Sequence, residues 1–244
     1  MLRAKNITFG YTEKKIFEEI SMTIKTGSIT TLIGPSGSGK TTLLRCLALL
    51  ERPESGSIQI DKDMYSWPWP EEKEFILPYP KLTTVFQQLF LWPHMTLREN
   101  IMLPDRLSGR ERKGARIQLA EMVEMFEMGD FINRYPNEVS LGQRQRVALA
   151  RALILQPRYL LLDEITSSLD VEQVAKILDC LKHLRDKDIG IFIVTHLLGF
   201  ARDAADQVAF LADGQLMEVG GPEILKHPKS KRLSRFLSII EAAS

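Results

Sequence analysis

Residues 34–41 read Gly34-Pro35-Ser36-Gly37-Ser38-Gly39-Lys40-Thr41 and match the phosphate-loop pattern G-x-x-x-x-G-K-[ST] at every position. Glycines in such a loop let successive backbone N–H groups point at one anion. Lys40 supplies a positive charge for the β- and γ-phosphates, and the Thr41 hydroxyl is a ligand for Mg²⁺. The pattern therefore favours a triphosphate site over a glycine-rich turn without a ligand.

The sequence on either side of this loop predicts an α/β fold. Residues 29–33 are β-branched or apolar, as is typical of a buried parallel strand, and a helix is predicted over about 40–50. Two more strands of this kind are predicted at 159–162 and 191–194, with an amphipathic helix over 171–186 between them. The strand, the loop and the helix come in the order that the motif requires.

Other patterns apply to the rest of the chain. Residues 2–27 alternate polar and apolar, which predicts antiparallel strands, and 208–219 predict a hairpin. Residues 61–81 are rich in proline and tryptophan and predict an irregular loop with edge strands. Helices are predicted within 97–155 and from about 222 onward.

Composition limits the class of protein. Of 244 residues, 26% are charged and 44% hydrophobic, which is ordinary for a soluble globular protein, and a net charge of +1 gives no reason to expect a nucleic-acid partner. Cys46 and Cys180 lack metal-ligand spacing, so we expect buried thiols in a reducing compartment. The longest apolar stretch, 189–200, is too short to span a bilayer, so a membrane role requires a partner.

Polar side chains follow several of the predicted strands. Asp163 and Glu164 end an apolar strand; the first suits Mg²⁺ and the second suits a general base for an attacking water. An acid pair is a weak signal alone but a strong one behind a phosphate loop. His196 and Gln87 also follow strands, at the edge where ligands bind in parallel sheets, although a lone histidine is more often structural.

A further motif precedes the helix predicted to end near Leu155. Ser140 and Gln143 form the S-x-x-Q pattern of a capping box, which by itself explains both residues structurally. The functional interpretation adds that this helix N-terminus, with its free N–H groups, is a second anion site.

Taken in order, these motifs resemble the ATP-binding subunit of ABC transporters over essentially the whole chain. The resemblance implies an α/β P-loop NTPase fold of the ABC ATPase type, with a RecA-like mixed-sheet core, an antiparallel β subdomain and a helical subdomain. It implies a single domain, 1–244. The core and β subdomain take about 1–88 and 156–221, the helical subdomain about 89–155 and a C-terminal helical tail about 222–244.

The resemblance also implies roles for individual residues, with ATP and Mg²⁺ as ligands. Tyr11 would stack on adenine, since an aromatic side chain suffices for base stacking. The implied catalytic residues are Glu164, His196, Gln87 and Lys40, and the implied metal ligands are Thr41, Gln87 and Asp163. The implied nucleotide-binding residues are Tyr11, Gly34, Pro35, Ser36, Gly37, Ser38, Gly39, Lys40, Thr41, Thr42, Ser140, Gly142, Gln143 and Asp170.

The implied partners follow from the family. Two chains would form a head-to-tail homodimer, each ATP lying between the phosphate loop of one chain and residues 140–143 of the other. The dimer would drive membrane permease subunits, and indirectly serve a substrate-binding protein, as a peripheral protein on the cytoplasmic face of the plasma (inner) membrane. Residues 45–53, 91–100 and 227–237 resemble the importers of polar amino acids most.

The chain departs from the family pattern at three positions. Its signature reads V-S-L-G-Q, with Leu141 in place of a glycine that faces the partner's ATP. If Ser140 caps the helix, Leu141 needs only helical dihedrals, although its side chain would crowd the phosphate or the partner's loop. Ile165 replaces a common proline, and Leu197 replaces a common acidic residue.

Several alternatives stay open. Similar subunits serve exporters, lipoprotein-release complexes and cell-division complexes. A second alternative is a regulatory module that binds ATP and hydrolyses it weakly. ABC-type ATPases of translation or DNA repair are less favoured, because this chain carries neither two cassettes nor a long coiled-coil insertion.

Overall fold

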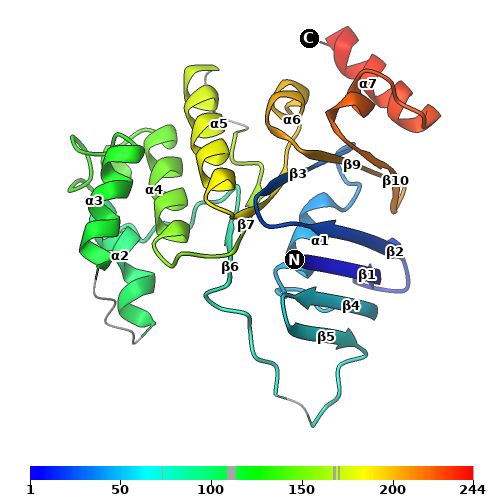
Figure 1. Ribbon diagram of the computed structural model, residues 1–244, viewed down its shortest axis with the longest axis horizontal. Coiled ribbons are helices and arrows are strands. Elements are labelled where there is room, and N and C mark those ends of the chain that lie inside the picture. The colour runs from blue at the N-terminus through cyan, green and yellow to red at the C-terminus, as the bar shows by residue number, and fades with distance from the viewer. Residues whose placement is uncertain (73, 109–113, 167–168, 170, 244) are drawn as a thin grey trace.

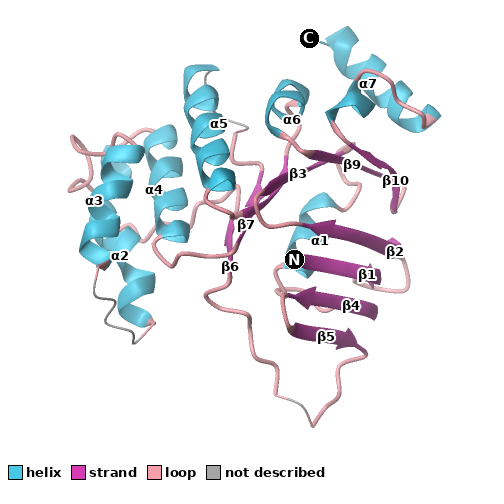
Figure 2. Cartoon of the chain, viewed as in Figure 1, coloured by secondary structure: helices cyan, strands magenta, loops and turns pink. Residues whose placement is uncertain are grey.

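The computed structural model describes residues 1–72, 74–108, 114–166, 169 and 171–243, and contains two β-sheets (Figures 1 and 2). The larger sheet has the order β10-β9-β3-β8-β7-β6; β10 is antiparallel to β9 and the other neighbours are parallel. The smaller, antiparallel sheet has the order β2-β1-β4-β5. The strands are β1 (Leu2–Gly10), β2 (Lys15–Ile24), β3 (Ser28–Ile33), β4 (Ser55–Ile60), β5 (Asp63–Trp67), β6 (Leu82–Val85), β7 (Tyr159–Asp163), β8 (Gly190–Val194), β9 (Gln207–Ala212) and β10 (Gln215–Gly220).

Helices cover the larger sheet. Figure 1 places α1 between the two sheets, and α2, α3 and α4 in a group beyond the edge strand β6. The predicted parallel strands and the predicted helix over 171–186 are confirmed. The helices are α1 (Lys40–Leu47), α2 (Leu97–Leu107), α3 (Ala115–Met125), α4 (Leu141–Leu153), α5 (Val171–Asp186), α6 (Leu198–Ala204) and α7 (Lys231–Ala243), with 3₁₀ turns η1 (Pro136–Glu138) and η2 (Pro222–Leu225).

Strand β7 shows why its sequence is apolar throughout. Leu160 and Leu162 point into a cluster formed with α2, α4 and α5, while Tyr159 and Leu161 point into a second cluster with α1 and the smaller sheet. Side chains alternate between the two faces of a strand, and here both faces are covered. The central sheet is therefore held on both sides, which fixes the edge from which the functional loops leave.

Helix α1 ends earlier than predicted. It stops at Leu47 instead of near Leu50, because Leu49 adopts the left-handed conformation with φ 59°. The Leu50 N–H then donates to the carbonyl oxygen of Arg45 at 2.9 Å, which closes the helix in the manner usually left to glycine.

The proline- and tryptophan-rich segment, 61–81, packs on itself. Beyond β5, the ring of Trp69 stacks on Tyr65, and Phe75 lies edge-on to Trp69 with ring centroids 5.0 Å apart. The guanidinium of Arg52 lies 4.7 Å from the Phe75 ring centre. Local packing therefore accounts for these aromatic residues.

Helix α3 and the residue after it pack against the cluster that contains Leu160 and Leu162. Phe126 is buried there, and Met122 and Met125 are partly buried against it. Cys46 and Cys180 are buried free thiols, and burial raises the pKa of each thiol to about 12. Both cysteines are thus inert at neutral pH.

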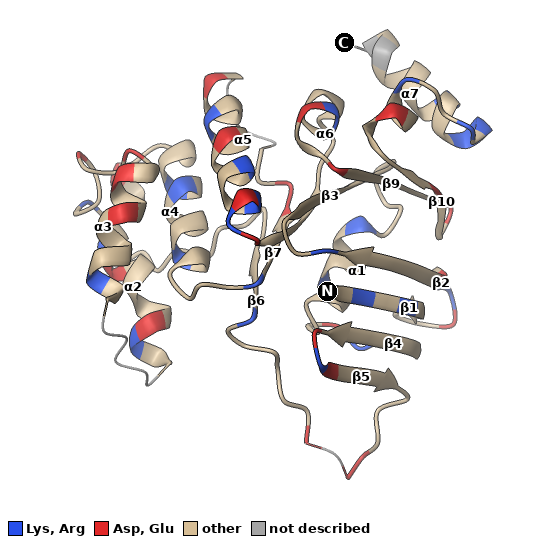
Figure 3. Ribbon diagram, in the orientation of Figure 1, with Lys and Arg blue, Asp and Glu red and all other residues tan. Residues whose placement is uncertain are grey.

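The C-terminal part returns to the larger sheet. The hairpin of β9 and β10 turns at residues 213–214 as predicted, and Arg232 of α7 donates to both carboxylate oxygens of Asp213, at 2.8 and 3.3 Å. Leu233 and Leu237 are buried against the β9 side of the sheet, so α7 is a packed helix. Figure 3 shows basic and acidic residues interspersed along the ribbon. None of the helices in the described ranges has the length and apolarity needed to cross a bilayer.

Candidate nucleotide-binding site

The parallel pairing brings the predicted functional loops to one edge of the larger sheet. Leu32 of β3 and Asp163 of β7 both pair with Val194 of β8, and Val85 of β6 pairs with Leu162. The four strands therefore end at the same level. The phosphate loop, the acid pair and the two segments that contain His196 and Gln87 leave from that edge, where parallel sheets bind ligands.

The phosphate loop has a geometry that suits an anion. The Lys40 ammonium donates to the carbonyl oxygens of Gly34 and Pro35, each at 2.9 Å, so the lysine is held across the loop. Gly39 has φ 94°, and a Cβ there would lie 2.7 Å from Ile16 Cγ2, so only glycine fits. Gly39 also precedes α1 without any side-chain cap, which leaves the first N–H groups of the helix for a ligand.

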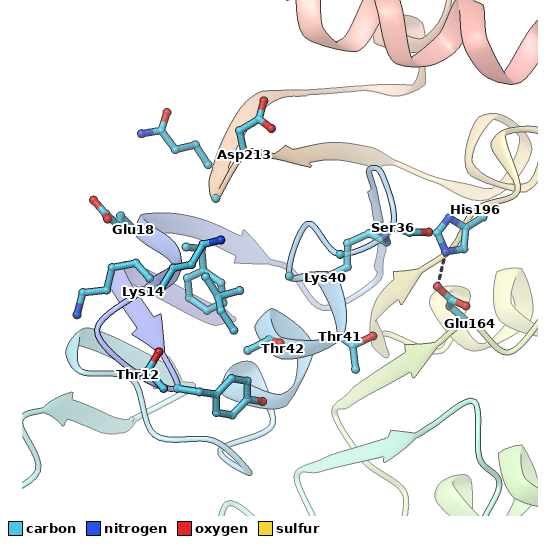
Figure 4. A pocket seen from close by; sticks show the side chains of 18 residues that line it. Thr12, Lys14, Glu18, Ser36, Lys40, Thr41, Thr42, Glu164, His196 and Asp213 are labelled. Carbon is cyan, nitrogen blue, oxygen red and sulfur yellow. Dashed lines mark ion pairs between the residues drawn. The ribbon is translucent and has the colours of Figure 1, made fainter.

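A cavity of about 880 Å³ opens over this loop (Figure 4). It extends from Tyr11, which is 59% exposed and lies edge-on to Phe9, to Glu164 and His196 at the other end. The predicted residues that line it are Tyr11, Ser36, Gly37, Gly39, Lys40, Thr41, Thr42, Glu164 and His196. Gly34, Pro35 and Ser38 belong to the same loop but do not line the cavity, and Ser38 is buried.

Thr41 and Asp163 come together behind the loop. The Thr41 hydroxyl donates to Asp163 Oδ1 at 3.1 Å, and Asp163 is only 5% exposed. Burial raises the pKa of Asp163, and the neighbouring Glu164 adds to that effect, against the Thr41 hydrogen bond and the charges of Arg45 and Lys40. Both oxygens belong to ligand types that suit Mg²⁺.

The charge state of Lys40 is also shaped by the site. Burial lowers the pKa of its ammonium, while the carboxylates of Glu164 and Asp163 act in the opposite direction. Within the described residues, no three His, Cys, Asp or Glu side chains gather into a metal cage. A cation here would therefore depend on Asp163, Thr41 and the phosphates of a nucleotide, which is how Mg²⁺ is usually held.

Glu164 Oε1 lies against His196 Nε2 across two strand ends, a contact that is an ion pair when the imidazole is protonated and that Figure 4 draws as a dashed line. Glu164 has φ 49°, and its N–H donates to the Val194 carbonyl oxygen at 2.9 Å. This backbone bond directs the carboxylate toward the loop after β8. The pair lies at the cavity end nearest to Thr41 and Ser36, so a carboxylate and an imidazole face the place that a terminal phosphate would take.

Gln87 does not line the cavity. It is exposed, two residues beyond the end of β6 and at the same sheet edge as Asp163. The structure thus places Gln87 beside the site, and its predicted contact with metal or water stays a prediction.

The residues at the start of α4 lie apart from this cavity. The predicted capping box is present: Ser140 accepts from the Gln143 N–H at 3.2 Å, and the Ser140 N–H donates to Gln143 Oε1 at 2.9 Å. Gly142 and Gln143 line a different cavity, of about 390 Å³, between α4 and α5. One chain therefore does not bring Ser140, Gly142 and Gln143 to its own phosphate loop. Asp170 lies outside the described residues.

Two parts of the cavity lining were not predicted from the sequence. One is the start of β2 with the turn before it, and the other is the β9–β10 turn, whose Gly214 carbonyl oxygen accepts from the Glu18 N–H at 3.1 Å. Only proximity to Tyr11 could have indicated the first part, and no local pattern indicates the second. The missed lining residues are Thr12, Lys14, Lys15, Ile16, Phe17, Glu18, Asp213, Gly214 and Gln215.

Comparisons with known proteins agree with this geometry. The family model described as "ABC transporter" matches residues 17–167. The chain is 37% identical to the arginine transport ATP-binding protein ArgV of Corynebacterium glutamicum, over 98% of this chain and 97% of that protein. It is 39% identical to the L-cystine import ATP-binding protein TcyN of Bacillus subtilis, over 97% and 92%. A dimeric, post-hydrolysis structure of the ATP-binding cassette MJ0796, with ADP and phosphate bound, superposes with a TM-score of 0.78 at 31% identity, covering 91% of this chain and 99% of that one.

Proposed function

This chain belongs to the ABC transporter family, and from that premise we propose that it is the ATP-hydrolysing subunit of a bacterial importer of polar amino acids. The observation that carries the proposal is the cavity over the phosphate loop, with Glu164 and His196 at one end and with Asp163 hydrogen-bonded to Thr41 behind the loop. The names of the two relatives, an arginine and a cystine transport protein, support the cargo class.

The predicted fold class is confirmed by the comparison with MJ0796 and by the mixed sheet. We propose the predicted subdivision as the domain organisation, with a core and β subdomain over about 1–88 and 156–221. The helical subdomain would take about 89–155, and the tail about 222–244. The grouping of α2, α3 and α4 beyond β6 supports this division.

The chain is an ATPase of the ABC family, and its residues suggest how hydrolysis proceeds. The phosphate loop binds the β- and γ-phosphates through its N–H groups and Lys40. Glu164 accepts the proton of the attacking water, and His196 orients Glu164 and donates to the γ-phosphate. Tyr11, exposed at the far end of the cavity, stacks on the adenine.

The residues behind the loop fit a magnesium ion. Asp163, Thr41 and Gln87 would hold it, together with phosphate oxygens. Bound Mg²⁺ supplies charge neutralisation on the transferring phosphoryl group. The contact between the Thr41 hydroxyl and Asp163 supports this role, and a divalent cation there would favour the carboxylate form that burial of Asp163 disfavours.

A homodimer would complete the site. Because the start of α4 lies away from the chain's own cavity, Ser140, Gly142 and Gln143 can reach an ATP only on another copy. We propose the same interface for Asp170. The dimeric state of MJ0796 supports this arrangement. ATP then favours the closed pair, and loss of phosphate releases it.

The permease has a candidate docking groove. A cavity of about 310 Å³ lies where the segment after α1 meets α2, α4, β6 and the segment before β6, and its lining is mainly apolar. Leu50, Leu77 and Tyr79 line it and are each about half exposed. Exposed apolar patches of this kind mark interaction sites. Docking here would hold the protein at the cytoplasmic face of the membrane, with the substrate-binding protein acting through the permease.

Uptake measurements test the proposed cargo. When the cells that naturally make this protein carry the Lys40→Ala variant in its place, uptake of at least one of labelled arginine, cystine and glutamine should be abolished. The reason is that the lysine contact with phosphate that supports hydrolysis is lost. Normal uptake of all three, with a defect in export or cell division, would instead favour the exporter, lipoprotein-release or cell-division alternatives.

A variant in the groove serves as the comparison in that experiment. Leu50→Glu places a charge on the half-exposed rim without touching the phosphate loop, so it should lower uptake much more than it lowers ATP hydrolysis by the purified protein. Equal losses in both assays would argue against docking at this groove.

Leu141→Gly tests the departure in the signature. Leu141 is the first residue of α4, with Ser140 as the N-cap, and it packs against the first hydrophobic cluster. Glycine should raise the ATPase rate if the leucine crowds the partner's phosphate. It should also lower stability, by about 0.5–1 kcal/mol for the backbone and by a further amount for the lost packing of Leu141. The rate is measured as phosphate release and the stability by thermal unfolding. An unchanged ATPase rate would mean that the leucine does not crowd the site. A low ATPase rate in both the wild type and Leu141→Gly would support the alternative of a regulatory module that binds ATP and hydrolyses it weakly.

A further inference from the structure

Arg151, in the last turn of α4, holds the segment that follows Gln87. Its guanidinium donates to two successive backbone carbonyl oxygens, that of Leu89 at 2.5 Å and that of Phe90 at 2.7 Å. Phe90 adopts φ 47°, a conformation that few residues other than glycine take, and the two bonds fix the chain there. Burial lowers the pKa of Arg151, so this is a partly desolvated charge bound to peptide oxygens.

The chain that precedes Gln87 is fixed as well. Val85 belongs to β6 and pairs with Leu162 of β7, one residue before Asp163. Only three residues, 86–88, therefore lie between the sheet and the buried Leu89. A segment of this length, anchored at both ends, has few conformations, and the position of Gln87 relative to Asp163 depends on both anchors.

A second anchor lies just beyond the first. The buried side chain of Asn100 on α2 accepts from the Trp92 N–H at 2.7 Å and donates to the carbonyl oxygens of Trp92, Met95 and Thr96 at 3.0–3.1 Å. The anchored segment thus runs continuously from β6 to α2, with Arg151 nearest to Gln87.

We propose that Arg151 is a positioning residue, which holds Gln87 in place for the magnesium ion and links that position to the opposite end of α4. The start of α4 carries Ser140 and Gln143, so one rigid helix joins the residues directed at the partner's nucleotide to those beside the chain's own. Arg151 also lines the proposed permease groove, so an occupant of the groove contacts the same side chain. The inference rests on the proposed role of Gln87 at the metal.

The test is a double-mutant cycle on the purified full-length protein. Arg151→Met is expected to lower ATP turnover about 10-fold, the usual size of an effect at a residue that supports a metal ligand, and Gln87→Ala, which removes the proposed ligand itself, should lower it by at least that factor. Each should also raise the Mg²⁺ concentration needed for half-maximal turnover. Because both act through Gln87, the double variant should match Gln87→Ala, whereas independent effects would multiply to about 100-fold or more. A multiplied loss, or an unchanged magnesium dependence in Arg151→Met, would overturn the proposal.

Arg146 provides a matched control on the same helix. Its guanidinium also donates to the carbonyl oxygens of two successive residues, Phe126 at 2.8 Å and Glu127 at 3.4 Å, but these lie far along the chain from Gln87. Arg146→Met should combine multiplicatively with Gln87→Ala and should not change the magnesium dependence. A shifted magnesium dependence in Arg146→Met would count against a specific role for Arg151.

The remaining outcomes are also decisive. If Arg151→Met does not fold, Arg151→Lys takes its place, because it keeps the charge and can reach only one of the two carbonyl oxygens. An intermediate shift in the magnesium dependence of Arg151→Lys supports the proposal, and an unchanged magnesium dependence overturns it. If Gln87→Ala retains full turnover, the role of Gln87 itself fails. If Gln87→Ala is impaired and Arg151→Met is not, only the positioning role of Arg151 fails.

Discussion

Replacing Glu164 with glutamine should lower kcat for ATP hydrolysis by about 10²–10⁴-fold, the contribution typical of a general base. Glu164 is the carboxylate at the phosphate end of the cavity, and its side chain is paired with His196. Glutamine keeps the shape and can still hydrogen-bond to the imidazole, but it cannot accept the proton of the attacking water. The measurement is phosphate release at saturating Mg²⁺ and ATP.

The same variant should change the oligomeric state. If hydrolysis is what releases the pair, Glu164→Gln with ATP should elute as a stable dimer in size-exclusion chromatography, while the wild-type protein returns to monomer as ATP is consumed. Glu18 is a suitable control, because it lines the same cavity at the opposite end, and Glu18→Gln should hydrolyse ATP at close to the wild-type rate (Figure 4). A Glu164→Gln monomer with normal turnover would contradict the assignment of the base.

The central sheet and its functional edge were predictable from the sequence, for a physical reason. Strands buried on both faces are apolar throughout, and a residue that ends such a run stands out, as Asp163 and His196 do. The capping box at Ser140 was equally visible, because its two side chains serve each other within one turn of helix. Local chemistry fixes both features.

Features that no local sequence pattern signals were not predictable. The end of α1 was missed because Leu49 adopts a left-handed conformation without being a glycine. The β9–β10 turn forms part of the cavity wall only because strand order places β9 beside β3, and no residue of the turn signals this. Arg151 reads as an ordinary surface arginine of an amphipathic helix until Leu89 and Phe90 are seen against it.

Asp163→Asn should have two thermal effects of opposite sign. In the protein without nucleotide, the variant should unfold at a higher temperature than the wild type, because asparagine removes a buried carboxylate and can still accept the Thr41 hydrogen bond. In the presence of Mg²⁺ and ATP, the wild type should gain about 2.7 kcal/mol at a ligand concentration 100 times Kd, or about 5–10 °C. The variant should lose most of this gain, and its ATP turnover should fall more than about 100-fold.

The pH dependence separates this explanation from a general packing effect. The fold raises the pKa of Asp163, so the unfavourable carboxylate is absent below the pKa of an unfolded aspartate, about 3.9, where both states are protonated. The stability difference between variant and wild type should therefore be largest near neutral pH and vanish toward pH 4. Asp105→Asn is the matched control: it is a buried acid on α2, away from the phosphate loop, and should keep the full Mg²⁺-ATP shift. An Asp163→Asn protein that retains that shift would place the metal elsewhere.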